Sequence, residues 1–76
     1  MAIYAEITKV GEDLSRARYG FSDGVEAARF AILDKTDGSV RAEDGLENIV
    51  YWAVARKIST AWARGGTAPE RLMVAS

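Results

Sequence analysis

The sequence of 76 residues contains no cysteine and no histidine. Without cysteine there can be no disulfide framework, no thiol nucleophile and no thiolate metal site. Without histidine the Ser-His-Asp and Cys-His arrangements are also excluded, so only carboxylates, lysine or tyrosine could act as an acid or a base. Residues 33–44 have some of the acidic spacing of a calcium loop, but Leu33 and Lys35 occupy two of its ligand positions. We therefore expect no enzyme activity, no metal and no cofactor.

The sequence also lacks an excess of charge of either sign. Ten lysines and arginines stand against eleven aspartates and glutamates, a formal net charge of −1. A nearly neutral chain has no overall field that would draw it to nucleic acid or to an anionic membrane, although a local patch could do so. No basic stretch followed by a long apolar run opens the sequence, so we expect no signal peptide, no membrane association and a cytoplasmic location.

The composition and the length are those of one folded domain. Hydrophobic residues make up 49% of the chain and charged residues 28%, an ordinary globular balance. A chain of this size is near the small end of what folds alone, so we expect no second domain within these residues. We expect a single small domain over residues 1–76.

Alternating apolar and polar residues predict strands in the first half of the chain. Residues 2–10 and 16–22 alternate with the period of two that is typical of a half-buried strand. Residues 25–33 also suit a short helix at their start, and we prefer a strand for the second half because Asp37-Gly38 follows as a hairpin turn. Residues 40–41 are predicted to form a short return strand. Short links between consecutive strands favour an antiparallel meander of three or four strands.

A long helix is predicted from about Gly45 to Arg64. Asp44 is its predicted N-cap, with Glu47 completing a capping box, and Gly65-Gly66 is predicted to end it through a left-handed C-cap. Pro69 then favours a short helix, while an added strand or a loose tail stays open. The fold class is therefore α+β: an antiparallel sheet packed on one face by one long helix, with a short C-terminal helical or docked segment.

The periodicities also predict which residues form the core. The helix residues that share the core-facing arc are Leu46, Val50, Val54, Ile58, Ala61 and Trp62, with Tyr51 at its edge. The strand residues predicted to face this arc are Ile3, Ile7, Tyr19, Phe21, Phe30 and Ile32.

Trp52 lies outside the core-facing arc and has two interpretations. In the first, the C-terminal residues 72–74 fold back over Ile49 and Trp52, as the need of a small chain to bury its apolar residues favours. In the second, the outer helix face is a contact surface, since aromatic residues and arginine are enriched at interface centres. The residues of this surface are Ile49, Trp52, Arg56 and Ser59. They support our leading hypothesis, a non-catalytic interaction or regulatory module that binds a protein partner or itself as a homodimer.

Strict alternation places several arginines on the sheet face away from the helix. The residues predicted there are Tyr4, Glu6, Thr8, Arg16, Arg18, Arg29 and Leu33. The simpler interpretation is a solvated face on which Glu6 pairs with Arg16 or Arg18 across strands. The alternative is a nucleic-acid interface formed by Arg16, Arg18 and Arg29, because arginine is the commonest reader of guanine in the major groove.

Three strands followed by a helix resemble, in the order of the elements, plant-type DNA-binding domains that lay their sheet in the major groove. The resemblance implies a nucleic-acid interface on the sheet. Against it, Glu6, Glu12, Asp13 and Glu26 would repel phosphate, and only three lysines are present to contact the backbone. We therefore favour a protein partner over nucleic acid, and a small-molecule site between sheet and helix is a third hypothesis.

Overall fold

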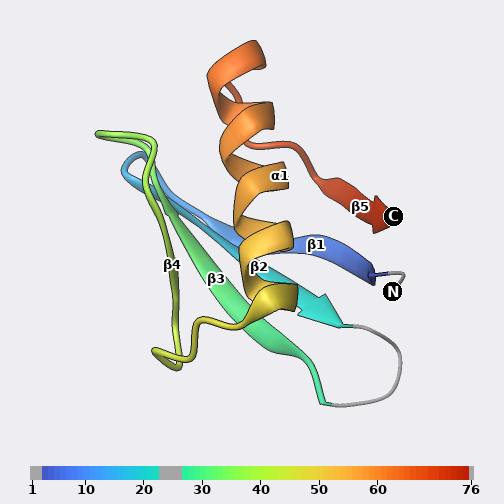
Figure 1. Ribbon diagram of the computed structural model, residues 1–76. Coiled ribbons are helices and arrows are strands. Elements are labelled where there is room, and N and C mark those ends of the chain that lie inside the picture. The colour runs from blue at the N-terminus through green and yellow to red at the C-terminus, as the bar shows by residue number, and fades with distance from the viewer. Residues whose placement is uncertain (1–2, 23–26, 76) are drawn as a thin grey trace.

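The computed structural model describes residues 3–22 and 27–75, in which one helix lies across one face of a five-stranded antiparallel sheet (Figure 1). The elements are β1 (Tyr4–Glu12), β2 (Arg16–Ser22), β3 (Arg29–Asp34), β4 (Val40–Ala42), α1 (Ile49–Gly65) and β5 (Arg71–Ala75). The order of the strands in the sheet is β4-β3-β2-β1-β5. The predicted α+β class and the first four strands of the meander are confirmed, while the sheet has five strands rather than three or four.

The C-terminal segment is the fifth strand, so the favoured short helix is wrong and the alternative of an added strand is confirmed. β5 pairs antiparallel with β1, with Tyr4 opposite Ala75 and Thr8 opposite Arg71. Leu72 and Val74 pack against the core, and the residues between and beside them are exposed. This period of two requires an extended chain, and Pro69 lies before the strand rather than in the first turn of a helix. Because β4 and β5 are opposite edges of the sheet, α1 connects one edge to the other.

The side chains of β3 that face α1 are the opposite set to the one that the sequence predicted. Ala31 and Leu33 are completely buried under α1, whereas Phe30 and Ile32 are half-buried on the other face. Both sets are apolar, so alternation alone could not decide which set faces the helix. The pairing register decides it, because Leu33 lies opposite the buried Ala17 of β2. The predicted core positions of Phe30 and Ile32 and the predicted open position of Leu33 are therefore wrong.

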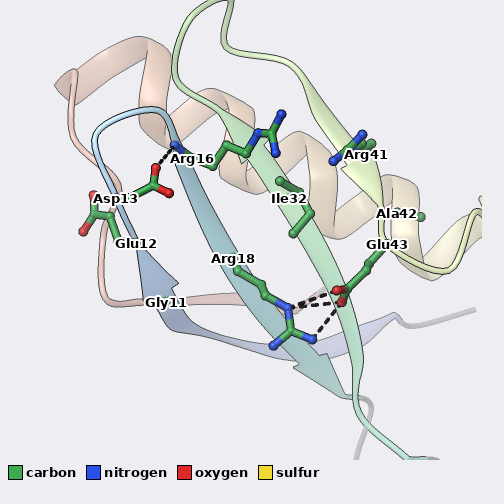
Figure 2. Close-up of a pocket in the computed structure, with 9 residues that line it drawn as sticks. All are labelled: Gly11, Glu12, Asp13, Arg16, Arg18, Ile32, Arg41, Ala42 and Glu43. Carbon is green, nitrogen blue, oxygen red and sulfur yellow. Dashed lines mark hydrogen bonds and ion pairs between the residues drawn. The ribbon is translucent and has the colours of Figure 1, made fainter.

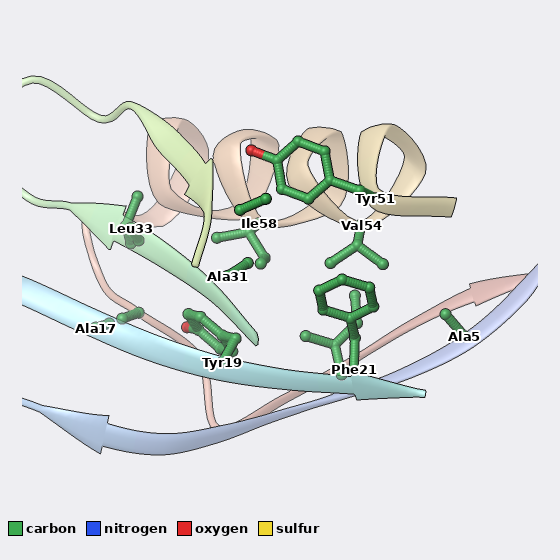
Figure 3. Close-up of a cluster of buried hydrophobic side chains, with 12 residues drawn as sticks. Ala5, Ala17, Tyr19, Phe21, Ala31, Leu33, Tyr51, Val54 and Ile58 are labelled. Atoms are coloured by element: carbon green, nitrogen blue, oxygen red, sulfur yellow. The ribbon is translucent and has the colours of Figure 1, made fainter. Parts of the chain in front are cut away.

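The core lies between α1 and the centre of the sheet. Figure 3 shows Tyr51, Val54 and Ile58 pointing from α1 toward the strands, where alanines alternate with the larger Tyr19 and Phe21. The strand residues buried in this core are Ala5, Ile7, Ala17, Tyr19, Phe21, Ala31, Leu33 and Ala42. Such small side chains let a helix pack close to a sheet while the aromatic rings fill the remaining space.

The predicted core arc of the helix is correct for Val54 and Ile58, which are completely buried, and for the partly buried Val50 and Trp62. Leu46 is the exception, because it precedes the helix and is 56% exposed. Tyr51, predicted at the edge of the arc, is buried in the core.

The two ends of α1 differ in how well the sequence predicted them. The N-cap is Asn48, whose side chain accepts a hydrogen bond from the backbone N–H of Tyr51 at 3.0 Å. The predicted capping box of Asp44 and Glu47 is therefore wrong, and the helix begins four residues later. At the other end Gly66 adopts the left-handed conformation with φ 66° and donates its N–H to the carbonyl of Trp62, as predicted.

The predicted turns are confirmed where the structure describes them. Gly38 has a φ of 76°, and its N–H donates to the carbonyl of Asp34 at 2.8 Å in the turn between β3 and β4. Asp23-Gly24, a dipeptide typical of a turn and expected to end the second strand, and the choice between helix and strand at residues 25–26 lie outside the described residues. Residues 27–28 have no regular structure, and β3 begins at Arg29.

Candidate functional site

The outer face of α1 exposes the surface predicted around Trp52. The side chains of Ile49 and Trp52 are 54% and 58% exposed, Arg56 is exposed, and Ser59 is half-buried. We call Ile49, Trp52, Arg56 and Ser59 the Trp52 stripe. Successive members are three or four residues apart, so they follow one side of the helix. The structure thus brings the four predicted contact residues together on one accessible surface.

The C-terminal segment does not cover Trp52. β5 is paired with β1 at the edge of the sheet, and Met73 is itself 52% exposed. The interpretation in which residues 72–74 fold back over Ile49 and Trp52 is therefore wrong. The only side-chain hydrogen bond of Trp52 within the described part of the chain is a long one, from its indole N–H to the Glu47 carboxylate at 3.4 Å. The indole ring is left accessible.

Trp62 has a different environment from Trp52. It packs against the core and lies beside the turn between β3 and β4, where a Cβ atom built on Gly38 would be 3.3 Å from its Cδ1 atom. The two tryptophans therefore report on separate regions, Trp62 on the core and Trp52 on the outer surface.

Arg29 lies on the helix side of the sheet and holds residues 44–48, which precede α1, through hydrogen bonds. Its guanidinium donates to the Asp44 carboxylate through Nε at 2.9 Å and Nη2 at 3.1 Å, to the Asn48 side chain at 3.1 Å, and to the Leu46 carbonyl. The Arg29 guanidinium beside Asp44 lowers the pKa of that carboxyl to about 2. The prediction that Arg29 shares the open sheet face with Arg16 and Arg18 is wrong, because Arg29 has the same orientation as Ala31 and Leu33.

The open face of the sheet carries Arg16 and Arg18, as predicted. They are joined there by Arg41 of β4 and Arg71 of β5, which lie opposite Ile32 and Thr8 in the register. Sequence reasoning missed both residues. The three residues of β4 were too few to assign a face, and β5 was predicted as a helix, although the alternation of Arg71 with Leu72 and Val74 was a signal that could have revealed it.

The ion pairs on this face differ from the predicted ones. Glu6 accepts a hydrogen bond from the Tyr4 hydroxyl at 2.9 Å rather than pairing with Arg16 or Arg18. This hydrogen bond raises the pKa of Tyr4. Arg18 instead pairs with Glu43, with 2.8 Å between Nη2 and Oε2, and its guanidinium lies 3.8 Å from the centre of the Phe30 ring. The Arg18 guanidinium thus contacts both a carboxylate and an aromatic ring.

A groove of about 570 Å³ opens on the same face between β2 and β4 (Figure 2). Ile32 of β3 lines it together with the side chains of Arg16, Arg18 and Arg41. The sequence led us to consider a small-molecule site between the sheet and the helix. The groove lies elsewhere, on the face of the sheet away from α1.

The structure itself defines the class of the protein as a small α+β domain with one face of its sheet covered by a helix. Comparisons with protein-family models, curated proteins and solved structures find no match to this chain. Among residues 3–22 and 27–75, no three His, Cys, Asp or Glu side chains come together where they could hold a metal ion. No helix in the same residues is long and apolar enough to cross a membrane.

Proposed function

We propose that the protein is a non-catalytic interaction module that binds a protein chain, either a different protein or a second copy of itself, through the Trp52 stripe. The observation that supports this most is the exposure of Ile49 and Trp52, 54% and 58%, on adjacent turns of one helix. Because about half of each residue stays in contact with water, the pair contributes less to the core of the monomer than the buried helix residues do. Its burial against a partner would release the apolar surface from water.

The chemistry of the stripe suits a protein partner. Tryptophan and arginine are the residues most enriched among those that dominate binding energy, and Trp52 and Arg56 are four residues apart on the helix. The Trp52 ring can fill a pocket on the partner while its indole N–H keeps a polar contact. Arg56 and Ser59 supply a polar margin beside the apolar pair, as is common at such interfaces.

The stripe is also held in a fixed position before binding. Ile49 and Trp52 belong to the first turn of α1, directly after the N-cap Asn48. Arg29 fastens Asn48 and Asp44 to β3 at the same end of the helix. A surface that is ordered in the free protein loses less conformational entropy on binding, which favours affinity.

The nucleic-acid alternative keeps two of its three predicted residues. Arg16 and Arg18 share the open sheet face, whereas Arg29 lies on the helix side and pairs with Asp44. The order of the elements, with four strands before the helix and one after it, also departs from the three strands and a helix on which the resemblance rested.

The proposal predicts that Trp52→Ala abolishes binding and preserves the fold. Sedimentation equilibrium over a range of concentrations measures self-association, and affinity capture from extracts of the protein's own cells detects another partner. Lys57→Ala, an exposed change about 140° around α1 from Trp52, is the matched control and should bind as the wild type does. A thermal unfolding curve of Trp52→Ala within about 0.5 kcal/mol of wild type would show that the loss is one of contact, as expected for a surface change.

Two results would contradict the proposal. In the first, the wild-type chain stays monomeric, and every protein that it captures is captured equally by Trp52→Ala. In the second, the Trp52→Ala variant is unfolded, which would show that the indole ring is part of the core.

A further inference from the structure

Two arginines that line the groove on the open sheet face have no carboxylate partner. Within residues 3–22 and 27–75, the cations held in ion pairs are Lys9, Arg18, Arg29 and Lys35. The guanidinium groups of Arg16 and Arg41 form no ion pair and no hydrogen bond in this part of the chain. Both line the groove of about 570 Å³ described above.

The carboxylates around the groove already have other partners. Glu12 accepts hydrogen bonds from Lys9 at 2.6 Å and Lys35 at 2.5 Å. Glu43 is paired with Arg18. Asp13 accepts from the backbone N–H groups of Ser15 and Arg16, each at 2.8 Å, and these bonds lower its pKa. Asp34, which lies opposite Arg16 in the register, accepts from the backbone N–H of Thr36. None of these carboxylates forms an ion pair with Arg16 or Arg41, so the two guanidinium groups stay available to a ligand.

The sheet brings the two free guanidinium groups together over an apolar floor. Ile32 of β3 lies directly opposite Arg18 of β2 and Arg41 of β4, and Arg16 is two residues before Arg18 at the start of β2. Figure 2 shows Arg16 and Arg41 extending toward each other on the same side of the sheet, above Ile32. Two like charges that face one another repel, and an anion between them would convert this repulsion into two attractive contacts.

We infer that this groove binds a compact phosphate-bearing small molecule, with its phosphate between Arg16 and Arg41 and the rest of the molecule against Ile32. A phosphate monoester carries close to two negative charges and three acceptor oxygens, which matches two guanidinium groups. The volume of about 570 Å³ exceeds that of a phosphate ion and falls in the range of small-molecule sites, roughly 300 to 1,000 Å³. The site lies on the sheet face away from α1, so it is separate from the Trp52 stripe and goes beyond the proposed function.

A compact ligand fits the groove better than a nucleic-acid strand. The lining includes Glu12 and Asp13 near the turn between β1 and β2, and Glu43 beyond Ile32, so carboxylates lie on both sides of the arginine pair (Figure 2). A continuous phosphate backbone would have to pass these acids, whereas a single phosphate need not. The Phe30 ring is covered by Arg18 at 3.8 Å, so it offers no free face for stacking a base.

The test is a titration of the isotope-labelled full chain with sodium pyrophosphate at constant ionic strength. NMR follows the Nε–Hε signals of the arginines at mildly acidic pH, where these protons exchange slowly. The inference predicts saturable shifts at Arg16 and Arg41 and none at Arg71, which lies on the same face outside the groove. Arg16→Ala or Arg41→Ala should each weaken pyrophosphate binding about tenfold or more, as expected for the loss of one charge-assisted contact. Arg71→Ala is the matched control and should leave the affinity unchanged.

Three results would overturn the inference. The first is a shift that rises linearly with pyrophosphate and is equal at Arg16, Arg41 and Arg71, which is ion screening only. The second is an unchanged affinity in Arg16→Ala and Arg41→Ala when their amide spectra show the wild-type fold. The third is a short DNA oligonucleotide that, at equal phosphate concentration, binds more tightly than pyrophosphate and displaces it, which would assign the groove to a nucleic-acid backbone. A weaker response to the oligonucleotide is the expected outcome.

Discussion

Tyr19 is the largest side chain that the described fold buries completely. Its hydroxyl donates a hydrogen bond to the Pro69 carbonyl at 2.8 Å, which ties β2 to the segment that leads into β5. Burial disfavours the charged phenolate and raises the pKa of Tyr19 from 10 to about 12. One residue thus links the centre of the sheet to its last strand and makes that link sensitive to alkali.

Stability is predicted to fall as the pH rises from 10 through 12. In this window the unfolded chain releases the Tyr19 proton while the folded chain keeps it, so the free energy of unfolding decreases as the pH rises. Denaturant unfolding at several pH values measures the dependence. Tyr19→Phe should be less stable at neutral pH, through loss of the hydrogen bond, and should show a shallower decline in this window. An equal decline in the variant would refute the assignment to Tyr19, since Tyr4 and Tyr51 are common to both proteins.

Asp44 gives the corresponding prediction at acid pH. Its pKa is lowered from 3.8 to about 2 by Arg29, so the Asp44 carboxylate stabilises the fold above the unfolded value and this contribution is lost as the pH falls through the folded value. Asp44→Asn should therefore be less stable than wild type at neutral pH, and the difference should narrow as the pH falls from about 4 toward 2. Thermal unfolding at a series of pH values measures it. A difference that stays constant over this range would show that the ionised Asp44 is not what holds the loop.

The elements show which parts of the fold could be predicted from sequence and why. The end of α1 was predicted at Gly65-Gly66 because a left-handed cap requires glycine, a stereochemical condition that is visible in one or two residues. The start was misplaced because Asp44 and Asn48 are both good capping residues. A tertiary contact decides between them: Arg29, distant in sequence, holds Asp44 as part of the preceding loop.

The N-cap assignment can be tested directly. Asn48→Ala removes the oxygen that accepts the backbone N–H of Tyr51 and should cost about 1 kcal/mol of unfolding free energy. Glu47→Ala is the comparison, because Glu47 belongs to the predicted capping box that the structure does not form. Its effect should stay within about 0.5 kcal/mol, as for other surface changes. Urea denaturation measures both, and a larger loss in Glu47→Ala than in Asn48→Ala would restore the capping box.

The strands illustrate the opposite case, in which local pattern is insufficient. Residues 30–33 of β3 are all apolar, so their alternation gives no preference for either face, and only the register with β2 selects Ala31 and Leu33 for the core. Arg41 could not be placed because the three residues of β4 are too few to assign a face. The candidate site on the helix was predictable because one helical period specifies a surface, whereas the groove depends on three paired strands.

At the scale of the whole molecule, the one-sided architecture separates two surfaces. The helix covers one face of the sheet (Figure 1), and the open face carries Arg16 and Arg41 (Figure 2). The Trp52 stripe lies on the outer side of the helix. Antiparallel sheets commonly leave one face to solvent, so this arrangement needs no second layer. The net charge of −1 gives no indication of the arginine pair, because acidic residues elsewhere in the chain balance these two cations. Changes at Trp52 and changes at the arginine pair are expected to act independently, since the sheet lies between them.

The most direct test of the Trp52 stripe follows the indole N–H signals of both tryptophans by NMR. The labelled protein is measured over a concentration series and, at one fixed concentration, in increasing amounts of extract from its own cells. We expect the Trp52 signal to shift or broaden in at least one series, while the signal of Trp62, whose ring is packed beside Gly38, stays unchanged. If both indole signals remain sharp and invariant in both series, the Trp52 stripe binds no protein and the proposed function is contradicted.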